Sequence, residues 1–218
     1  MIALSHLLLS GEVARTLVEF LEVAITMIVF LKGFYPSAAF ERRRYMNVVV
    51  QRARHPELRD YIHSAASGLL PFIQKNDALN NVCKQGLVER VAVIFFSSDN
   101  VPVERFIFKL TINLSSAASV EENQLEFALR SFLVKLSVAN PLVKPLPPNC
   151  RWEVTAYLRS LPDVGSSKEG ELWIPTDTKQ WMKPPVITPV KSLNSEPLCL
   201  QLYLEHPSLS ETQPCQAL

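Results

Sequence analysis

Residue types that carry acid–base chemistry come together at one place in the sequence. Asp60, His63 and Ser64 lie within five residues, in a stretch with helical periodicity. A nucleophile and its base must converge on a shared substrate, whereas neighbours on a helix surface project outward side by side. We therefore expect a solvated helix face here. The sequence also has no glycine-rich phosphate loop, nucleophile elbow or zinc-protease motif, so we predict no enzyme activity and no catalytic residue.

Potential metal ligands are scattered along the chain. The four cysteines show no C-x-x-C spacing, and the four histidines do not cluster with them; the cysteines are Cys83, Cys150, Cys199 and Cys215. A zinc site needs four converging ligands, so we predict neither a metal nor another cofactor. Reduced thiols suit a nuclear or cytosolic compartment.

One stretch is strongly basic. Glu41 is followed by Arg42, Arg43 and Arg44, and two more arginines come at positions 52 and 54. Several guanidinium groups on one hairpin can neutralise nucleic-acid phosphates. The alternative is a solvated loop and edge strand, where charge deters wrong pairing. We favour the alternative because no aromatic residues interleave with the arginines to form a stacking platform.

The composition is that of a folded protein with a stiffened C-terminal third. The chain has 218 residues, of which 48% are apolar and 20% charged, and its formal net charge is +1. No global field therefore draws it to nucleic acid or to anionic membranes. The apolar run 1–10 lacks the basic start of a signal peptide, and the run 23–31 is too short to span a bilayer, so we expect a soluble protein. Of the 16 prolines, many follow residue 141.

Hydrophobic periodicity predicts the elements and the fold class. Residues 12–32 form a helix that is apolar nearly all round, and a second helix starts at Pro56 and kinks late, at Pro71. A third helix starts at Ser119, where Ser119 and Glu122 make a capping box. Expected strands are 45–51, 89–97, 101–114, 150–159, 186–190 and 198–205. The order predicts an α+β fold with three helices on one face of a small antiparallel sheet.

The segment 162–183 is polar and irregular, yet it contains Trp173. A tryptophan is costly to leave exposed, so we expect this one to pack on a partner. An extended peptide gains main-chain hydrogen bonds at a sheet edge, and a segment that must open before release slows dissociation. We therefore interpret the chain as a non-enzymatic adaptor that traps a partner peptide beneath residues 165–205.

Collinear sequence blocks resemble one known family. They begin with LVEFLEV at 17–23 and continue with YP at 35–36, FERR at 40–43, YMNV at 45–48, HPEL at 55–58, VPVERF at 101–106, LRSF at 129–132 and QLY at 201–203. The chain thereby resembles the HORMA-domain adaptors of the Rev-seven type, the accessory subunits of translesion DNA polymerase zeta. The resemblance covers residues 11–205 in order, and the residues in these blocks are similar to those of plant members.

The resemblance implies a HORMA domain at 11–205, with residues 165–205 as a "safety belt" and flexible termini at 1–10 and 206–218. It implies that a proline-containing peptide of the polymerase zeta catalytic subunit lies at the sheet edge, against Tyr61 and the belt residue Trp173. Ile187, Gln201 and Tyr203 match positions that receive the C-terminal domain of a second polymerase, Rev-one. Isoleucine stands at 187 where the family has leucine.

The resemblance also implies a self-association role for Arg130, with a second copy or with another HORMA protein. It implies a nuclear protein in DNA-damage tolerance, present also in the cytoplasm, with no membrane and no sequence-specific nucleic acid as partner. Sister HORMA proteins use the same belt to sequester checkpoint or anaphase-promoting-complex activators, and that cell-cycle role is the alternative. Residues 1–10 and a longer link at 76–85 depart from the family pattern.

Overall fold

The computed structural model describes residues 2–74, 87–112, 122–139, 145–160, 173–176, 181, 184–195 and 198–207. For 2–10, 122–123 and 195 it describes the backbone alone. Several predictions fall outside these residues: the capping serine Ser119, the link 76–85, and the cysteines Cys83 and Cys215. The other two cysteines, Cys150 and Cys199, are free thiols and half-buried.

Helix α1 (Ile2–Leu31) runs through the centre of the molecule. Side chains on every side of it are buried, as predicted: Leu17, Val18, Phe20, Leu21, Ala24, Ile25, Met27, Ile28 and Val29. Gly33, at φ 61°, ends the helix in the left-handed conformation that glycine adopts without strain. The structure corrects the predicted start of this helix. The helix starts at Ile2 rather than at residue 12, so it runs through the segment assigned to a flexible terminus.

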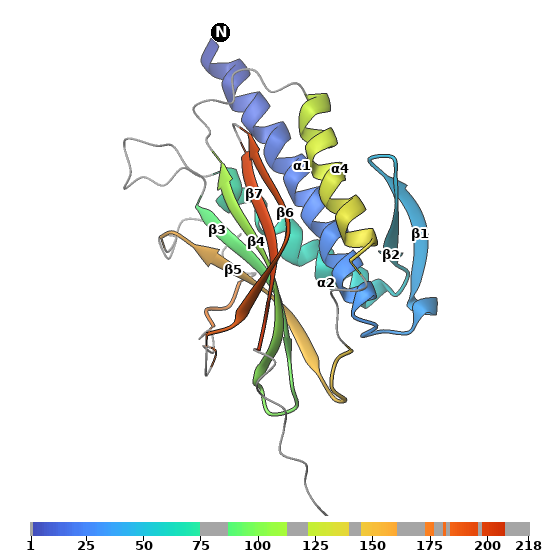
Figure 1. The fold of residues 1–218 in the computed structure, drawn as a ribbon. Helices are drawn as coiled ribbons and strands as arrows, with labels where there is room; N and C mark the ends of the chain where they lie inside the picture. Colours follow the sequence, from blue (N-terminus) through green and yellow to red (C-terminus); the bar gives the residue numbers. More distant parts are fainter. Residues whose placement is uncertain are drawn as a thin grey trace, which may run out of the picture.

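A five-stranded antiparallel sheet packs against the helices (Figure 1). Its strands are β3 (Val88–Phe96), β4 (Pro102–Ile112), β5 (Arg151–Leu158), β6 (Val186–Ser195) and β7 (Leu198–His206), in the order β5-β3-β4-β7-β6. The inner face carries alternate apolar residues, as period two requires: Val91, Val93, Phe95, Phe106, Phe108, Leu110, Leu200, Leu202 and Leu204. Phe20 of α1 meets Phe108 edge to face, with ring centroids 6.2 Å apart.

The other two long helices lie beside α1 on the same face of the sheet, which confirms the predicted fold class. Helix α4 (Glu122–Ser137) packs on α1 through Phe132 and Phe20, whose centroids are 6.0 Å apart. Helix α2 (Pro56–Ser67) begins at the predicted proline. It ends earlier than predicted and is followed by the short α3 (Leu70–Gln74). The proline ring clashes with the carbonyl four residues back, which for Pro71 is Ser67, the last residue of α2.

The predicted strand 45–51 is confirmed only for residues 48–51, because a separate two-stranded hairpin with its turn at 46–47 occupies this region. The short 3₁₀ helix η1 (Ser37–Ala39) leads into β1 (Phe40–Tyr45), which pairs with β2 (Val48–Ala53) around a two-residue turn. Met46 and Asn47 sit in that turn at φ 45° and 58°, the left-handed pair that a type I′ hairpin needs. The turn lacks the usual glycine, so the sequence concealed it. Figure 1 shows the hairpin on the far side of α1 and α4 from the large sheet.

Candidate functional site

Strand β5 ends the large sheet, and its outer edge carries backbone groups directed away from β3. The strand pairs with β3 in antiparallel register, with Val154 opposite Val93. The Val154 amide does not point at β3: it donates to the Tyr61 hydroxyl across 3.3 Å. In an antiparallel strand the direction of the amides alternates, so Trp152 and Ala156 present theirs at the same outer edge. This edge is a template for one further strand.

Helix α2 places Tyr61 over that edge. The side chain is 44% exposed, and its ring meets Trp152 edge to face at 5.3 Å. Trp152 is held in turn by its indole N–H, which donates to the Tyr35 hydroxyl at 3.3 Å. Burial raises the pKa of the Tyr61 phenol. The hydroxyl therefore stays protonated at neutral pH, and while it accepts from Val154 it can donate to a carbonyl of another chain.

Trp173 comes from the C-terminal segment and lies on the same side of α2. Its indole nitrogen is so close to Gly68 that a Cβ built there would be 2.9 Å from it. The nitrogen is buried and has no hydrogen-bond partner among the described residues. The next residue, Ile174, is 86% exposed. Tyr61 and Gly68 are seven residues apart, which places them on one helix face. Tyr61, Trp173 and the β5 edge therefore come together, as a site for an extended peptide requires.

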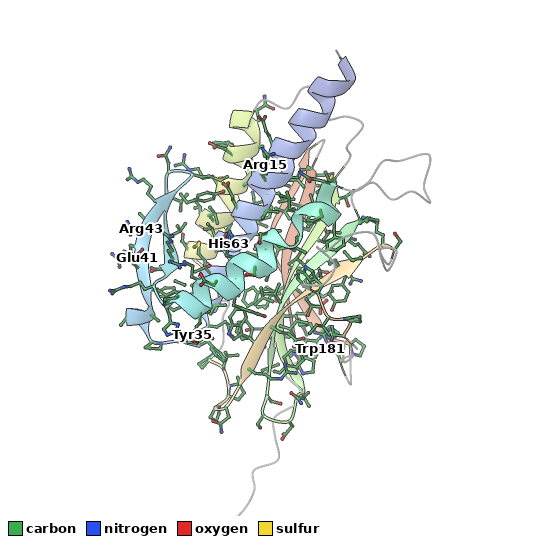
Figure 2. The ribbon with its side chains drawn as sticks, turned by 180° about the vertical axis from the view of Figure 1, so that it is seen from behind. Arg15, Tyr35, Glu41, Arg43, His63 and Trp181 are labelled. Carbon is green, nitrogen blue, oxygen red and sulfur yellow. The ribbon has the colours of Figure 1, made fainter. Side chains whose placement is uncertain are left out.

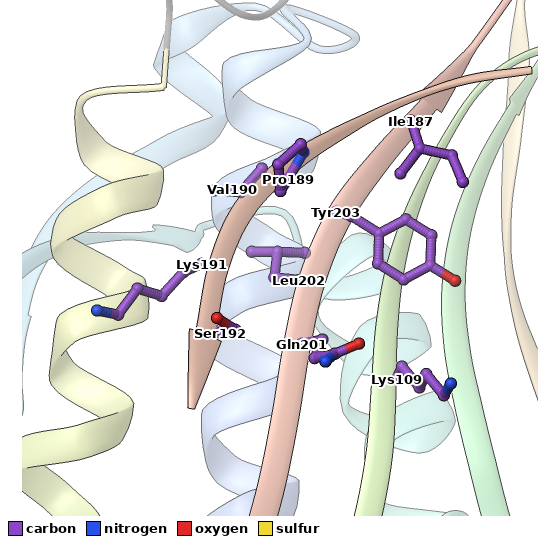
Figure 3. Close-up of a pocket in the computed structure, with 9 residues that line it drawn as sticks. All are labelled: Lys109, Ile187, Pro189, Val190, Lys191, Ser192, Gln201, Leu202 and Tyr203. Atoms are coloured by element: carbon purple, nitrogen blue, oxygen red, sulfur yellow. The ribbon is translucent and has the colours of Figure 1, made fainter. Parts of the chain in front are cut away.

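The opposite end of the sheet carries a second candidate surface. Ile187, Gln201 and Tyr203 line an open pocket of about 700 Å³ on the sheet face turned away from the helices (Figure 3). Gln201 lies beside Lys109 of β4, and Tyr203 lies between Ile107 of β4 and Pro189 of β6. Ile187 is 59% exposed. The structure thus brings these three predicted residues into one pocket.

The chemistry of this pocket is mixed. Ile187 and Pro189 offer apolar surface, while Gln201 and Tyr203 offer hydrogen-bonding groups, and burial raises the pKa of the Tyr203 phenol so that it stays protonated. An apolar patch with a few fixed polar groups is typical of a protein-binding surface. The pocket is lined by residues of β4, β7 and β6, so the sheet order places it toward the end of the sheet opposite the β5 edge.

The predicted self-association residue, Arg130, is exposed on α4. The structure adds an apolar stripe that sequence analysis missed: Phe127 is 73% exposed, Val134 45% and Val138 63%. Steps of seven and four residues keep these three on one helix face, with Arg130 at its side. The signal was available, because all three fall outside the buried stripe that the helix pattern predicts.

The sequence matches the model of one known protein family. Residues 14–164 of the chain match the family described as HORMA domain. The chain belongs to the HORMA domain family. The resemblance found in the sequence and the predicted fold class are thereby confirmed.

Similar HORMA proteins fall into two groups by name. The "DNA polymerase zeta processivity subunit" of Arabidopsis thaliana is 84% identical over 202 residues, which cover 93% of this chain and 89% of that protein. The human "Mitotic spindle assembly checkpoint protein MAD2B" is 33% identical, over 88% of this chain and 90% of its own. These are names of an accessory subunit and a checkpoint protein, in accord with a non-catalytic HORMA adaptor.

Solved HORMA structures share the fold at low sequence identity. A chain of the "Crystal Structure of Mitotic Checkpoint Complex" superposes with a TM-score of 0.69 at 16% identity, over 89% of this chain and 98% of that one. The "Structure of C. elegans HTP-2 bound to HIM-3 closure motif" gives a TM-score of 0.65 at 9% identity, over 92% of each chain. These comparisons show the fold alone.

Trp181 is a further residue that sequence analysis did not single out. Its indole N–H donates to the Glu205 carboxylate at 3.2 Å, and the Arg105 guanidinium stacks on its ring at 4.8 Å. Arg105 also pairs with Glu205 at 3.7 Å. Trp181 of the predicted belt is thus tied to β4 and β7. A second tryptophan in a polar segment was the available signal.

The groups first considered for chemistry do not form a site. His63 meets Glu22 of α1 at 2.9 Å, and Asp60 meets its neighbour Arg59 at 3.2 Å. Within the part of the chain that the structure describes, no three acidic, histidine or cysteine side chains gather as metal ligands. None of the helices described here combines the length and apolarity needed to cross a membrane.

Proposed function

We propose that this HORMA protein is the accessory subunit of a DNA polymerase zeta. It holds an extended, proline-containing peptide of the catalytic subunit at the β5 edge, beneath residues 165–205. It offers the Ile187, Gln201 and Tyr203 pocket to the C-terminal domain of Rev-one, and so bridges two polymerases in translesion synthesis. The nucleus is the compartment that this role requires.

The observation that carries the proposal is the outer edge of β5 with Tyr61 and Trp173 beside it. The Val154 amide already bonds outside the sheet, and Tyr61 accepts it. A peptide strand that pairs with this edge would accept hydrogen bonds from the backbone amides of β5. Its alternate side chains would pack against the two aromatic rings. The Trp173 indole nitrogen, buried without a partner among the described residues, would have a peptide carbonyl as its acceptor.

Peptide-binding measurements test this site. A labelled proline-containing peptide of the catalytic subunit is titrated with wild type, Tyr61→Ala and Trp173→Ala. Buried aromatic anchors cost about 2 kcal/mol or more when truncated, so each variant should bind about 30-fold more weakly. Ile174→Ala is the matched control, because that side chain is 86% exposed beside Trp173. Equal affinity for all four proteins would remove the site assignment.

The second surface has its own test. Binding of the Rev-one C-terminal domain should fall at least tenfold for Ile187→Ala and Tyr203→Ala, since a contact worth about 1.4 kcal/mol corresponds to a factor of ten. Val186→Ala is the control, because its alternate position on β6 turns it away from the pocket. Peptide binding at β5 should persist in these variants, since the two sites lie at opposite ends of the sheet.

A cell-cycle role is the second candidate. The observation that favours it is the checkpoint name of the relatives at 33% identity. In that role the same β5 edge would hold a peptide of an anaphase-promoting-complex activator, and the Ile187 pocket would not be needed. Pull-down of an activator peptide that survives Ile187→Ala and Tyr203→Ala, together with no binding of Rev-one, would favour the checkpoint role.

A further inference from the structure

The β1–β2 hairpin concentrates positive charge in a protein that is otherwise slightly acidic. Five of the 22 basic residues lie in 40–54, against one of the 21 acidic residues, which leaves the rest of the chain with a formal net charge of −3. All five are arginines and all are exposed: Arg42, Arg43, Arg44, Arg52 and Arg54. Residues 40–54 have a formal charge of +4, of which +3 is on the two six-residue strands and +1 on Arg54, directly after β2.

The arginines do not lie on an edge of the main sheet, so they do not protect that sheet from wrong pairing. The two strands form a sheet of their own, on the far side of α1 and α4 from the five-stranded sheet. Edge protection relies mostly on lysine, and here every basic residue is arginine. Arginine has a planar fork of donors that matches phosphate oxygens two at a time, and it is held more weakly by water than lysine.

The arginines of the two strands lie close enough together to act on the same carboxylate, Glu41. Arg43 donates to Glu41 at 2.8 Å, and this hydrogen bond holds the pKa of the Glu41 carboxyl below its ordinary value, with further lowering by the charges of Arg43, Arg52 and Arg54. Figure 2 shows Glu41 and Arg43 at the outer rim of the molecule, far from Trp181, which contacts the five-stranded sheet. Guanidinium groups from both strands thus surround the Glu41 carboxylate, and the remaining arginines of the hairpin face solvent.

We propose that this hairpin binds the phosphate backbone of double-stranded nucleic acid, without reading its sequence. Each strand is about 20 Å long, so arginines along the hairpin can reach phosphates on both sides of a groove about 12 Å wide. Phe40 is buried and Tyr45 half-buried, so the hairpin offers no exposed ring on which single-stranded bases would stack. The net charge of +1 concealed this property, because the rest of the chain offsets the hairpin.

Fluorescence anisotropy with a labelled DNA duplex of about 30 base pairs tests the proposal, with salt varied from about 50 to 200 mM. Wild type should bind with an affinity that falls steeply with salt and does not depend on base sequence. Arg42→Gln, Arg44→Gln and Arg52→Gln together should weaken binding by about tenfold or more. They should also reduce the logarithmic salt slope by about 3, since each phosphate that is no longer neutralised lowers it by about one unit.

Two variants keep the result independent of folding. Arg15→Gln, Arg59→Gln and Lys135→Gln together remove the same charge from exposed positions on α1, α2 and α4, and should leave most of the affinity. Glu41→Gln removes the one carboxylate of the hairpin and should strengthen binding, a gain that misfolding cannot produce. Equal loss in the two triple variants would overturn the proposal, as would tighter binding of a poly-glutamate peptide than of the duplex. The hairpin lies apart from β5, so peptide trapping can fail its own test while this one succeeds.

Discussion

At the scale of single residues, Gly68 is where the belt meets helix α2. It ends α2 with φ −63°, a conformation open to any residue, so the need for glycine is steric. A Cβ there would lie 2.9 Å from the Trp173 indole nitrogen and 3.0 Å from the Ser64 carbonyl oxygen. We predict that Gly68→Ala displaces Trp173, shifts its fluorescence and weakens peptide binding about tenfold, since the packing of a central anchor is disturbed.

Gly11→Ala is the matched control for that change. Gly11 lies inside α1, and a Cβ there would meet the Gln74 side chain at 3.8 Å, an ordinary contact. Alanine in a helix interior is about 1 kcal/mol better than glycine, so this variant should be more stable and bind peptide normally. If both variants bind as wild type does, Trp173 does not depend on Gly68 for its position.

The Tyr45 hydroxyl is buried and has no hydrogen-bond partner among the described side chains. Burial raises the pKa of this phenol, and the nearby Glu19, Glu126 and Glu22 raise it further. An unfolded tyrosine releases its proton near pH 10, whereas the folded one keeps it. Above that pH the folded state holds more protons, so the free energy of unfolding should fall as pH rises.

We therefore predict that Tyr45→Phe raises the free energy of unfolding by about 1 kcal/mol, because an unsatisfied buried hydroxyl is removed. The loss of stability above pH 10 should also be shallower than in wild type. Denaturant unfolding at neutral and alkaline pH measures both effects. Tyr35→Phe serves for comparison: its hydroxyl accepts from Trp152 at 3.3 Å, so that variant should be less stable.

At the scale of elements, two tryptophans anchor the predicted belt. Trp173 meets α2 at Gly68, and Trp181 is fixed to β4 and β7 through Arg105 and Glu205. Release of a trapped peptide would require the belt to leave these contacts. We predict that Trp181→Ala speeds peptide dissociation about tenfold, because it removes a hydrogen bond and a cation–π interaction worth about 1.4 kcal/mol together.

Dissociation is followed by chasing a labelled peptide with excess unlabelled peptide. Trp181→Phe keeps a ring beneath Arg105 and removes the hydrogen bond to Glu205, so its rate should lie between those of wild type and Trp181→Ala. A Trp181→Ala rate equal to that of wild type would mean that the belt opens without breaking this anchor.

Most strands and helices followed from periodicity because their faces are buried on one side. The alternation of Phe106, Phe108 and Leu110 located β4, and Pro56 located the start of α2. The β1–β2 turn did not follow, because Met46 and Asn47 adopt left-handed backbone without a glycine signal. The start of α1 at Ile2 did not follow either, because the spacing of apolar residues predicted a helix only from residue 12.

The candidate site was predicted only in part. Tyr61 came from resemblance, and Trp173 came from resemblance and from its place in a polar segment. No local pattern showed that α2 would bring both to the β5 edge. That meeting depends on contacts between residues 93 positions apart, such as Tyr61 with Val154. Trp181 was missed for the same reason, since its partners Arg105 and Glu205 lie on strands that pair only in the folded sheet.

At the scale of the whole molecule, the candidate surfaces face different directions. The β5 edge and the Ile187 pocket are at opposite ends of the sheet, and the basic hairpin is beyond the helices. Under the proposals above, one small domain would hold a peptide, a second protein and a phosphate backbone at the same time. Partners at separate surfaces do not compete for the same residues, which is what an adaptor requires.

We propose the apolar stripe on α4 as a surface for a second HORMA domain. Phe127, Val134 and Val138 extend about 16 Å along the helix, and exposed apolar stripes of this kind mark protein interfaces. Arg130 at its side would supply a charged contact at the rim. We predict that the protein forms a concentration-dependent dimer, and that Phe127→Ala and Arg130→Glu each shift it toward monomer by about tenfold in dissociation constant.

Sedimentation velocity over a range of concentrations measures this equilibrium. Arg59→Glu reverses the same charge at an exposed position on α2, outside the α4 stripe, and should leave the dimer intact. If it dissociates the dimer as Arg130→Glu does, the effect is one of net charge and the stripe is not the interface. A dimer that persists in Phe127→Ala would place self-association on another face, because truncating a side chain that is 73% exposed in the monomer cannot be silent at the centre of an interface.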